Sequence, residues 1–309
     1  MSNATAKRRR EVIADGADLE YGNGRSLTPA PHAKLRYVAR IPGRHFVRNL
    51  VERRALVAQL VRRDFEQRYV GSAAGWLWGV VHPLVMLASW IFVFQICLKI
   101  PPPAGVPSYP AFLFAGFLPW LLFQETVSRS AGSLVEHSNL ITRTVFPSEV
   151  VPVSIFLSSL IHHLIGVTLA AAAAAIVFKN FNPVGLALGL ALLPVYMVAI
   201  GLLSVGVGWI VASLHVYLRD TGQVLSVAMT LWFWLTPIMI TEQQIPPRFH
   251  VLVAWNPMAF VVRAYRERLL SATWPHWHEL AILAAYSTLV FIAGGLFFRH
   301  LKRGFADVL

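Results

Sequence analysis

The sequence predicts an all-α polytopic membrane protein with six transmembrane helices, an N-terminal interfacial amphipathic helix and an external re-entrant hairpin before the last span. Of its 309 residues, 56% are hydrophobic and only 14% are charged, whereas about a quarter of the residues in a soluble domain are charged. Six apolar stretches meet or approach the roughly 20 residues needed to cross about 30 Å of hydrocarbon. The net charge of +12 is concentrated near the N-terminus, where 15 of the 27 Lys and Arg precede Gly71, as expected for a cytoplasmic side that faces anionic lipid.

Residues 1–44 are predicted to form a polar, largely disordered cytoplasmic tail. The basic run Lys7–Arg10 is not followed by an apolar stretch, so it does not resemble a cleavable signal peptide. The rest of the tail is rich in Gly, Pro, Ala and charge, without apolar periodicity. No aromatic or motif context accompanies the basic run, so we do not expect nucleic-acid binding.

Residues 45–70 are predicted to form an amphipathic helix that lies on the membrane and contacts its lipids. Apolar residues recur at helical spacing, with charged residues on the other side. The apolar side is formed by Val57, Val61, Phe65 and Tyr69, and the polar side by Arg53, Arg62, Arg63 and Arg68.

Residues 71–309 are predicted to form a six-span transmembrane domain. Its apolar stretches are Trp76–Leu98, Ala111–Val127, Val150–Phe178, Val184–Leu214, Val224–Ile240 and Ala281–Phe298. At the start of the domain, Gly71, Gly75 and Gly79 recur every four residues, which predicts a bare helical face that another helix can approach closely. Trp76 and Trp78 lie where indoles favour the headgroup boundary.

The distribution of Lys and Arg predicts that both termini are cytoplasmic. In that orientation, 21 of these residues fall on the cytoplasmic side and 6 on the external side. The external connection from Thr241 to Glu279 is too apolar for a free loop, and Asn256-Pro257 divides its apolar run into halves that are each too short to span.

We expect residues Val251–Val262 to form a re-entrant helical hairpin that enters the outer leaflet. A helical hairpin keeps its backbone N–H and C=O groups hydrogen-bonded at that depth. Arg263, Arg266 and Arg268 then mark its return to the external surface. A surface amphipathic helix is the alternative.

Several chemistries are absent from the sequence. No Gly-x-x-x-x-Gly-Lys-Ser/Thr phosphate loop is present, so any ATP hydrolysis must come from a partner. The apolar stretches lack the buried carboxylates that ion-driven carriers use, which disfavours a secondary transporter. His162 and His163 are adjacent, so on a helix they point about 100° apart and cannot share a metal. We therefore expect no cofactor, no metal and no catalytic group in this chain.

Aromatic and neutral polar residues are available to line a substrate path. Aromatic faces stack on the C–H faces of sugars and give weak contacts along which a polymer can slide; the alternative is that they are lipid-facing or packing residues. The residues assigned to the path are Trp90, Phe94, Gln95, Trp232 and Trp234.

Two cytoplasmic connections are candidate docking elements, although both are also compatible with ordinary turns that follow the charge rule. The first has room for a short helix that ends near Pro147, and the second follows the fourth span. Their candidate residues are Ile141, Arg143, Val145, Phe146, Arg219 and Asp220.

Five short motifs together resemble the membrane subunits of polysaccharide ABC exporters, which move O-antigen, capsule or teichoic acid chains. From about Leu56 onward they occur in the order of that family. They are Arg63-Asp64 through Arg68-Tyr69, then Gly71-Ser72, with Gly75-Trp76-Leu77-Trp78 and His82-Pro83-Leu84; Asn139-Leu140-Ile141 to Phe146-Pro147; Tyr217 to Asp220; Thr236-Pro237-Ile238; and Trp255-Asn256-Pro257.

The resemblance implies a homodimeric permease in the bacterial cytoplasmic membrane, bound by two copies of a separate ATP-binding cassette subunit that holds ATP-Mg. It implies coupling helices around Ile141–Phe146 and Tyr217–Asp220, and an external gate that includes Trp255, Asn256 and Pro257. The tail of residues 1–44 is longer than the family pattern predicts.

The functional hypothesis is ATP-driven export of a lipid-linked polysaccharide, with Arg62, Arg63 and Arg68 meeting the lipid diphosphate at the inner surface beside Trp76 and Trp78. One alternative is a permease for a small lipid, drug or ion. A membrane-embedded glycosyl- or acyltransferase is another, and it would have to use the cluster formed by Glu242, His276, His278 and Glu279.

Overall fold

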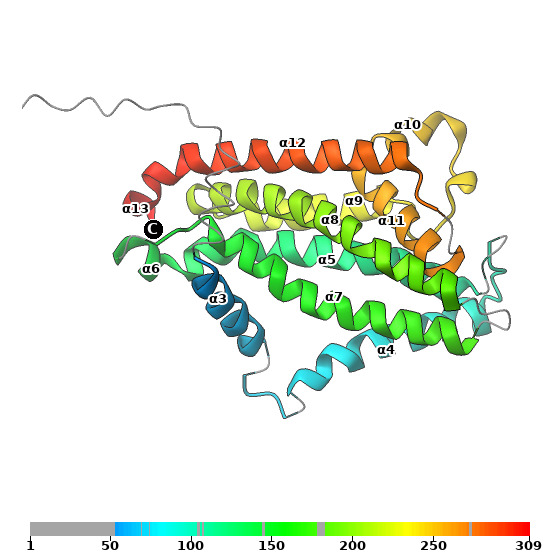
Figure 1. Ribbon diagram of the computed structural model, residues 1–309. Coiled ribbons are helices and arrows are strands. Elements are labelled where there is room, and N and C mark those ends of the chain that lie inside the picture. Colours follow the sequence, from blue (N-terminus) through cyan, green and yellow to red (C-terminus); the bar gives the residue numbers. More distant parts are fainter. Residues whose placement is uncertain are drawn as a thin grey trace, which may run out of the picture. The chain divides into compact units, whose positions relative to one another are not determined.

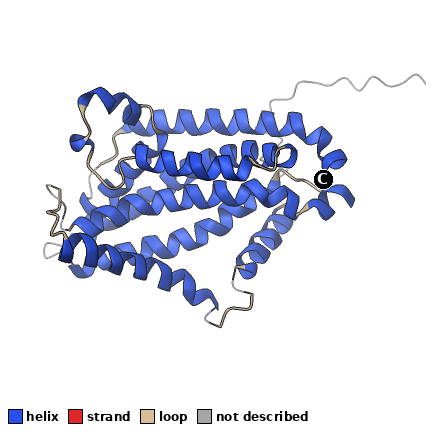
Figure 2. Cartoon of the chain, turned by 180° about the vertical axis from the view of Figure 1, so that it is seen from behind, coloured by secondary structure: helices blue, strands red, loops and turns tan. Residues whose placement is uncertain are grey.

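Helices make up all of the regular secondary structure that the computed structural model describes (Figures 1 and 2). The described residues are 53–68, 70–73, 75–103, 106, 108–143, 146–177, 183–271 and 274–309. An apolar chain that satisfies its backbone hydrogen bonds within each helix is the solution a bilayer demands. The all-helical prediction is confirmed for this part of the chain, and the predicted tail lies outside it.

Five helical segments are long and apolar enough to cross a membrane. They are Trp78–Cys97, which combines α4 (Trp78–Trp90) with a π-helix (Ile91–Cys97); α5 (Tyr109–Glu136); α7 (Val150–Val177); α8 (Pro183–Tyr217); and α12 (Trp277–Leu301), which continues into a 3₁₀ turn (Lys302–Gly304). The described part of the chain ends with α13 (Phe305–Val308).

The predicted fifth span is shorter than expected. It forms α9 (Thr221–Leu235), a helix of 15 residues, whose length is about 22 Å at 1.5 Å per residue. The helix ends because Thr236 precedes Pro237 and takes an extended conformation, as residues before proline prefer. Six spans therefore remain a prediction.

The second span, in contrast, is longer than predicted. The expected stretch ended at Val127, but α5 continues through Arg129 to Glu136. Charged residues normally mark the end of an apolar span. Here α5 continues past Arg129 because the side chain of Arg129 pairs with Asp64 of another helix, α3 (Arg54–Gln67).

The predicted bare glycine face before the first span is wrong. Gly71 and Gly75 have φ angles of 78° and 52°, in the left-handed region, so they lie in a turn between α3 and α4. Gly75 begins a short 3₁₀ helix (Gly75–Leu77), and only Gly79 of the three lies in an α-helix. The four-residue spacing thus reflects the needs of a turn, where residues with side chains would be strained.

The apolar connection before α12 contains two short helices, α10 (His250–Ala254) and α11 (Pro257–Arg266), separated at Asn256 as predicted. Its position relative to a bilayer stays a prediction. The expectation that its arginines return to the surface is wrong for Arg268, whose side chain is fully buried, and for Arg266, which points into the bundle toward backbone carbonyls. Arg266 donates to backbone oxygens, and Nη2 of Arg268 donates to Glu267 and to the carbonyl of Trp274, whereas Nε and Nη1 of Arg268 are buried without a hydrogen-bond partner among the described residues.

The core is built around α8, which packs against α5 on one side and α12 on the other, while α7 packs against α5. At the α8–α12 contact Gly206 and Gly294 meet so closely that a Cβ on Gly294 would lie 2.1 Å from the carbonyl oxygen of Gly206. Small residues allow this approach of two backbones.

The two ends of the bundle carry different elements (Figure 1). One end, called here the α6 end, carries α3, the short helix α6 (Ser138–Arg143), α13 and the C-terminus. The opposite end, called the α10 end, carries α10 and the 3₁₀ turns Glu242–Gln244 and Pro247–Phe249. Because α5 is 28 residues long, its roughly 42 Å length connects the two.

Candidate functional sites at the two ends of the bundle

Four charged side chains near the α6 end form an alternating network between α3 and α5. Asp64 and Arg68 are four residues apart along α3 and its C-cap, as are Glu125 and Arg129 on α5, so each pair lies on one face of its helix. Arg129 binds both carboxylate oxygens of Asp64, and Arg68 pairs with Glu125. These side chains are between 17% and 33% exposed, so their attraction is only partly screened.

Arg68 extends the network to α7. Its guanidinium lies 3.0 Å from the hydroxyl of Ser159 and 3.1 Å from Nδ1 of His162. Phe65 of α3 also stacks on the His162 ring, with the centroids 5.1 Å apart. The network therefore joins three helices that are far apart in the sequence.

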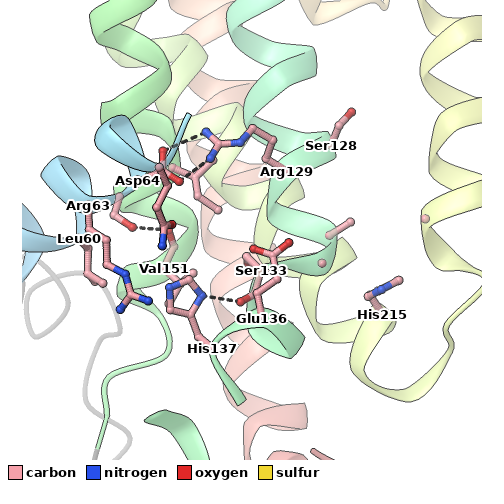
Figure 3. Close-up of a pocket in the computed structure, with 16 residues that line it drawn as sticks. Leu60, Arg63, Asp64, Ser128, Arg129, Ser133, Glu136, His137, Val151 and His215 are labelled. Atoms are coloured by element: carbon pink, nitrogen blue, oxygen red, sulfur yellow. Dashed lines mark hydrogen bonds and ion pairs between the residues drawn. The ribbon is translucent and has the colours of Figure 1, made fainter. Parts of the chain in front are cut away.

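A polar cavity of about 380 Å³ opens beside this network (Figure 3). The Asp64–Arg129 pair forms part of its wall, and Arg63, Glu136 and His137 lie near the pair. His215, from the end of α8, lines it from another side. Since α3, α5, α7, α8 and α9 all contribute, the cavity lies where these helices meet at the α6 end.

The network lowers the pKa of Asp64 below its ordinary value of 3.8. Burial raises this pKa, but the hydrogen bonds and positive charge of Arg129, with the charge of Arg68, outweigh the burial. A carboxylate with a lowered native pKa stabilises the folded state above its unfolded pKa and loses that contribution as the pH falls through the native value.

We expect Asp64→Asn to lower the free energy of unfolding by about 2 kcal/mol near neutral pH, because it leaves a partly buried guanidinium without its charge partner. The difference between wild type and variant should shrink as the pH falls below about 3.8. Thermal unfolding in detergent micelles, measured across this pH range, checks the prediction. Glu66→Gln on the same helix is the matched control, since Glu66 pairs only with the exposed Arg62 among the described residues. A loss that is independent of pH would contradict the charge argument.

The residues predicted for the inner mouth of the substrate path occupy different positions. Arg62 is exposed, Arg63 lines the polar cavity, and Arg68 is held by the network. Trp78 begins α4 and is 52% exposed, whereas the side chain of Trp76 lies outside what the structure describes. Among the predicted residues whose side chains the structure describes, Arg63 lines the cavity and Arg68 belongs to the network beside it.

The predicted coupling residues also lie at the α6 end. Ile141 of α6 and Phe146 after it pack against the core, whereas Arg219 and Asp220 are exposed in the turn between α8 and α9. The side chain of Arg143 and all of Val145 lie outside the described residues.

The C-terminal segment is also part of this end, which sequence analysis missed. Phe305 is buried, α13 contacts α6, and Lys302 pairs with Glu149 at 2.7 Å. The only signal in the sequence is an apolar residue, Phe305, after the basic end of the last span.

At the other end of the bundle, Asn256 connects two motifs that are 20 residues apart. Its Oδ1 accepts hydrogen bonds from the backbone N–H of Met258, at the start of α11, and from the indole N–H of Trp232. Its Nδ2 donates to Thr236 Oγ1 at 2.9 Å. Asn256 thereby caps α11 and ties it to the end of α9, while Trp255 is exposed and Pro257 occupies the first turn of α11.

We expect Asn256→Ala to lower the free energy of unfolding by about 2–3 kcal/mol, because the cap is lost and buried polar groups of Trp232 and Thr236 lose a partner. Trp232→Phe removes only the indole donor and should cost less. Thermal unfolding in micelles compares the two variants. Equal losses would show that Asn256 acts through Trp232 alone.

Two arginines of α11 fix this helix to its surroundings. Arg263 pairs with Glu242 at 2.7 Å and also with Glu279 of α12. Arg266 donates to the backbone oxygens of Phe112, Pro237 and Ile238 at 3.2, 2.8 and 2.6 Å. Arg266 therefore joins the non-helical residues that follow α9 to the first turn of α5.

Three of the aromatic residues predicted for the path are half-buried and contact other aromatic rings of the chain. Trp90 lies edge-on to Phe117 with centroids 5.1 Å apart, Phe94 lies beside Tyr109, and Trp232 packs on Phe123. Gln95 and Trp234 are exposed, the latter at 68%. Trp234 and Gln95 are the path candidates that this chain leaves open to another surface.

Residues 55–270 match the family model described as ABC-2 type transporter. The chain is 26% identical over 255 residues to an O-antigen export system permease protein RfbA of Klebsiella pneumoniae, covering 82% of this chain and 95% of that protein. It is 26% identical to the RfbA of Myxococcus xanthus, covering 84% and 98%. It is 24% identical to the polysialic acid transport protein KpsM of Escherichia coli, covering 79% and 92%.

Proposed function

Because this chain belongs to the ABC-2 type transporter family, we propose that it is the membrane-spanning permease of an ATP-driven exporter of a lipid-linked polysaccharide. The observation that carries the proposal is the similarity to O-antigen export permeases over 95% and 98% of their lengths. A separate ATP-binding cassette subunit supplies ATP hydrolysis, since the sequence has no phosphate-binding loop. The chain itself carries substrate and binds no cofactor, and ATP-Mg resides on the partner.

The working unit in this proposal is a homodimer with two ATPase subunits, in the bacterial cytoplasmic membrane. The segment Trp78–Cys97 supports a second copy, because none of its most apolar window is buried within one chain. α9 and the turn after it form the predicted fifth span, which brings the number of spans to six. Both termini and the α6 end face the cytoplasm, which places the basic side chains of the N-terminal region on that side.

In this unit residues 1–44 are a cytoplasmic tail, 45–70 an interfacial segment and 71–309 the transmembrane domain. The packing of α3 indicates which side of the interfacial segment, residues 45–70, faces the lipid headgroups. The buried residues of α3, Val57 and Leu60, pack with Val150 of α7, and the exposed side of α3 carries Arg53, Arg54, Arg62 and Arg63. That side suits anionic lipid headgroups better than lipid tails.

Arg63 is our candidate for contact with the lipid diphosphate, because it lines the polar cavity and pairs with no other described residue. Arg62 and Arg68 contribute positive charge nearby. Arg63→Ala should weaken the binding of purified lipid-linked polymer to the permease, whereas Arg53→Ala, which removes an exposed charge from the start of the same helix, should not. Equal affinity of the Arg63 variant and wild type in a vesicle-binding assay would rule out this role.

Movement at the ATPase reaches the permease through α6 and the turn that contains Arg219 and Asp220. α10 and α11, with Trp255, Asn256 and Pro257, form a re-entrant external gate. The faces of Trp90, Phe94, Gln95, Trp232 and Trp234 line the path in the dimer, with Gln95 and Trp234 the most accessible of the five.

Deleting the gene for this chain in its native cell tests the proposed cargo. Polymer should then accumulate on the cytoplasmic side of the membrane, detected by a lectin that stains permeabilised but not intact cells. Expression of the wild-type chain should restore surface staining. Normal surface polymer in the deletion strain would favour a permease for a small lipid, drug or ion.

A further inference from the structure

The attachment of α3 to the bundle has an apolar part, which joins it to α7, and an ionic part, which joins it to α5. The apolar part is formed by Val57 and Leu60 against Val150, with Leu56, Val61, Phe146 and Leu157 packed around them. Apolar contacts are non-directional, so they do not by themselves fix the position of α3 relative to α5. The direction of the attachment comes from the charged network, in which Arg129 binds Asp64 through two nitrogens.

The network also fixes which helix α3 follows. Asp64 and Arg68 each bind a partner on α5, and their partners are one helical turn apart. Two contacts in sequence along both helices prevent α3 from sliding or rotating against α5, because either movement would break both pairs together. The two pairs therefore oppose separate movement of α3 and α5, while Arg68 also contacts Ser159 and His162 of α7, on which α3 packs.

α5 is placed to carry such movement across the molecule. Its last residue, Glu136, comes two positions before α6 begins. Near its other end, the carbonyl of Phe112 accepts a hydrogen bond from Arg266, and a Cβ on Gly116 would lie 2.8 Å from the Arg266 guanidinium. One continuous helix, with Pro119 inside it, therefore leads to the proposed coupling helix at one end and touches the proposed external gate near the other.

We infer that Asp64 and Arg129 are positioning residues that lock α3 to α5, so that the stroke received at the α6 end turns α5 and reaches Arg266 of α11. This role rests on the proposed function. Without the pair, the ATPase still binds and hydrolyses ATP. However, α3 changes its position relative to α5, and less of each ATPase stroke reaches α11. The expected signature is a lower amount of polymer exported per ATP, which a purely structural role would not produce.

The test replaces the ion pair by a covalent link that can be opened. Cys97 is the single cysteine of the chain, so Cys97→Ser gives a background free of thiols, into which Asp64→Cys and Arg129→Cys are introduced together. Removing both partners leaves no unpaired charge in that pair. Both positions line the polar cavity, which a small bis-maleimide with a cleavable disulfide can enter. Vesicles hold the permease with its ATPase, and ATP hydrolysis and polymer export are measured together.

Before cross-linking, export per ATP should fall about fivefold, within the usual range of coupling changes. Cross-linking should restore the wild-type amount of polymer exported per ATP. Reduction of the linker should lower that amount again to its value before cross-linking. The exposed pair Ala55→Cys with Gln59→Cys, four residues apart within α3, is the matched control and should show no change in any of the three states. If the cysteine variant does not fold, Asp64→Asn with Arg129→Gln repeats the first measurement.

Wild-type export per ATP in the uncross-linked variant would overturn the inference. So would a ratio that stays low after mass spectrometry shows complete cross-linking. A wild-type complex that hydrolyses ATP but moves no polymer would instead overturn the proposed function, and the coupling role with it. The two failures are therefore distinguishable in the same assay.

Discussion

Replacing Arg266 with methionine should lower the free energy of unfolding by about 3–5 kcal/mol, the largest effect expected from one side chain at the α10 end. The guanidinium donates to three backbone carbonyls, those of Phe112, Pro237 and Ile238, and lies 3.5 Å from the centroid of the Phe112 ring. Methionine keeps the length of the side chain and removes every donor. The carbonyls after α9 have no helical partners, so their loss is not recovered within the chain.

Thermal unfolding in detergent micelles measures this change, and two further variants sharpen it. Arg266→Lys keeps the charge but not the planar fork, so it should lie between wild type and Arg266→Met. Gly116→Ala places a methyl group 2.8 Å from Nη2 of Arg266. That substitution should destabilise the wild type but have little effect in the Arg266→Met variant, because the two sites share one contact. Additive losses would contradict the contact described here.

Gly294→Ala should destabilise the protein by about 3 kcal/mol or prevent its assembly, because the new methyl group overlaps backbone rather than a movable side chain. The added Cβ would lie 2.1 Å from the oxygen and 2.8 Å from the carbonyl carbon of Gly206. α12 would have to move away from α8, its largest packing partner.

The neighbouring Gly295→Ala is the control for this prediction. Its Cβ would first meet the ring of Trp209 at 3.3 Å, and alanine is about 1 kcal/mol more favourable than glycine within a helix. Yield of folded protein and thermal unfolding in micelles should therefore separate the two adjacent positions. Similar behaviour of both variants would mean that α8 and α12 do not approach through Gly206 and Gly294.

The sequence carries the fold class and the approximate place of most helices, because hydrophobic length depends only on local composition. It also predicts the break at Asn256-Pro257, since proline disfavours helix at the residue before it. The extension of α5 past Val127 was not predictable in this way. It depends on Asp64, 65 residues from Arg129 in the chain, and no local pattern shows that the two charges meet.

In the candidate sites, too, local sequence patterns identify individual residues but not the contacts between residues that are far apart in the chain. Trp232, Thr236 and Asn256 could each be singled out from their motifs, but their mutual hydrogen bonds depend on the packing of α9 against α11. Arg266 was predicted at the surface because an arginine beside an apolar run usually is. Its burial depends on three carbonyls contributed by the start of α5 and the break after α9. The glycines of the turn at Gly71 and Gly75 could not be distinguished from a helical glycine face without their φ angles.

Reconstitution of the purified chain with its ATP-binding cassette partner tests the central claim most directly. Vesicles carrying both subunits and lipid-linked polymer in one leaflet should move the polymer across the bilayer when ATP is added, as measured by its protection from an added glycosidase. Vesicles with this chain alone should show no ATP-dependent movement. Polymer translocation without the ATPase, or equal translocation with and without ATP, would contradict the account.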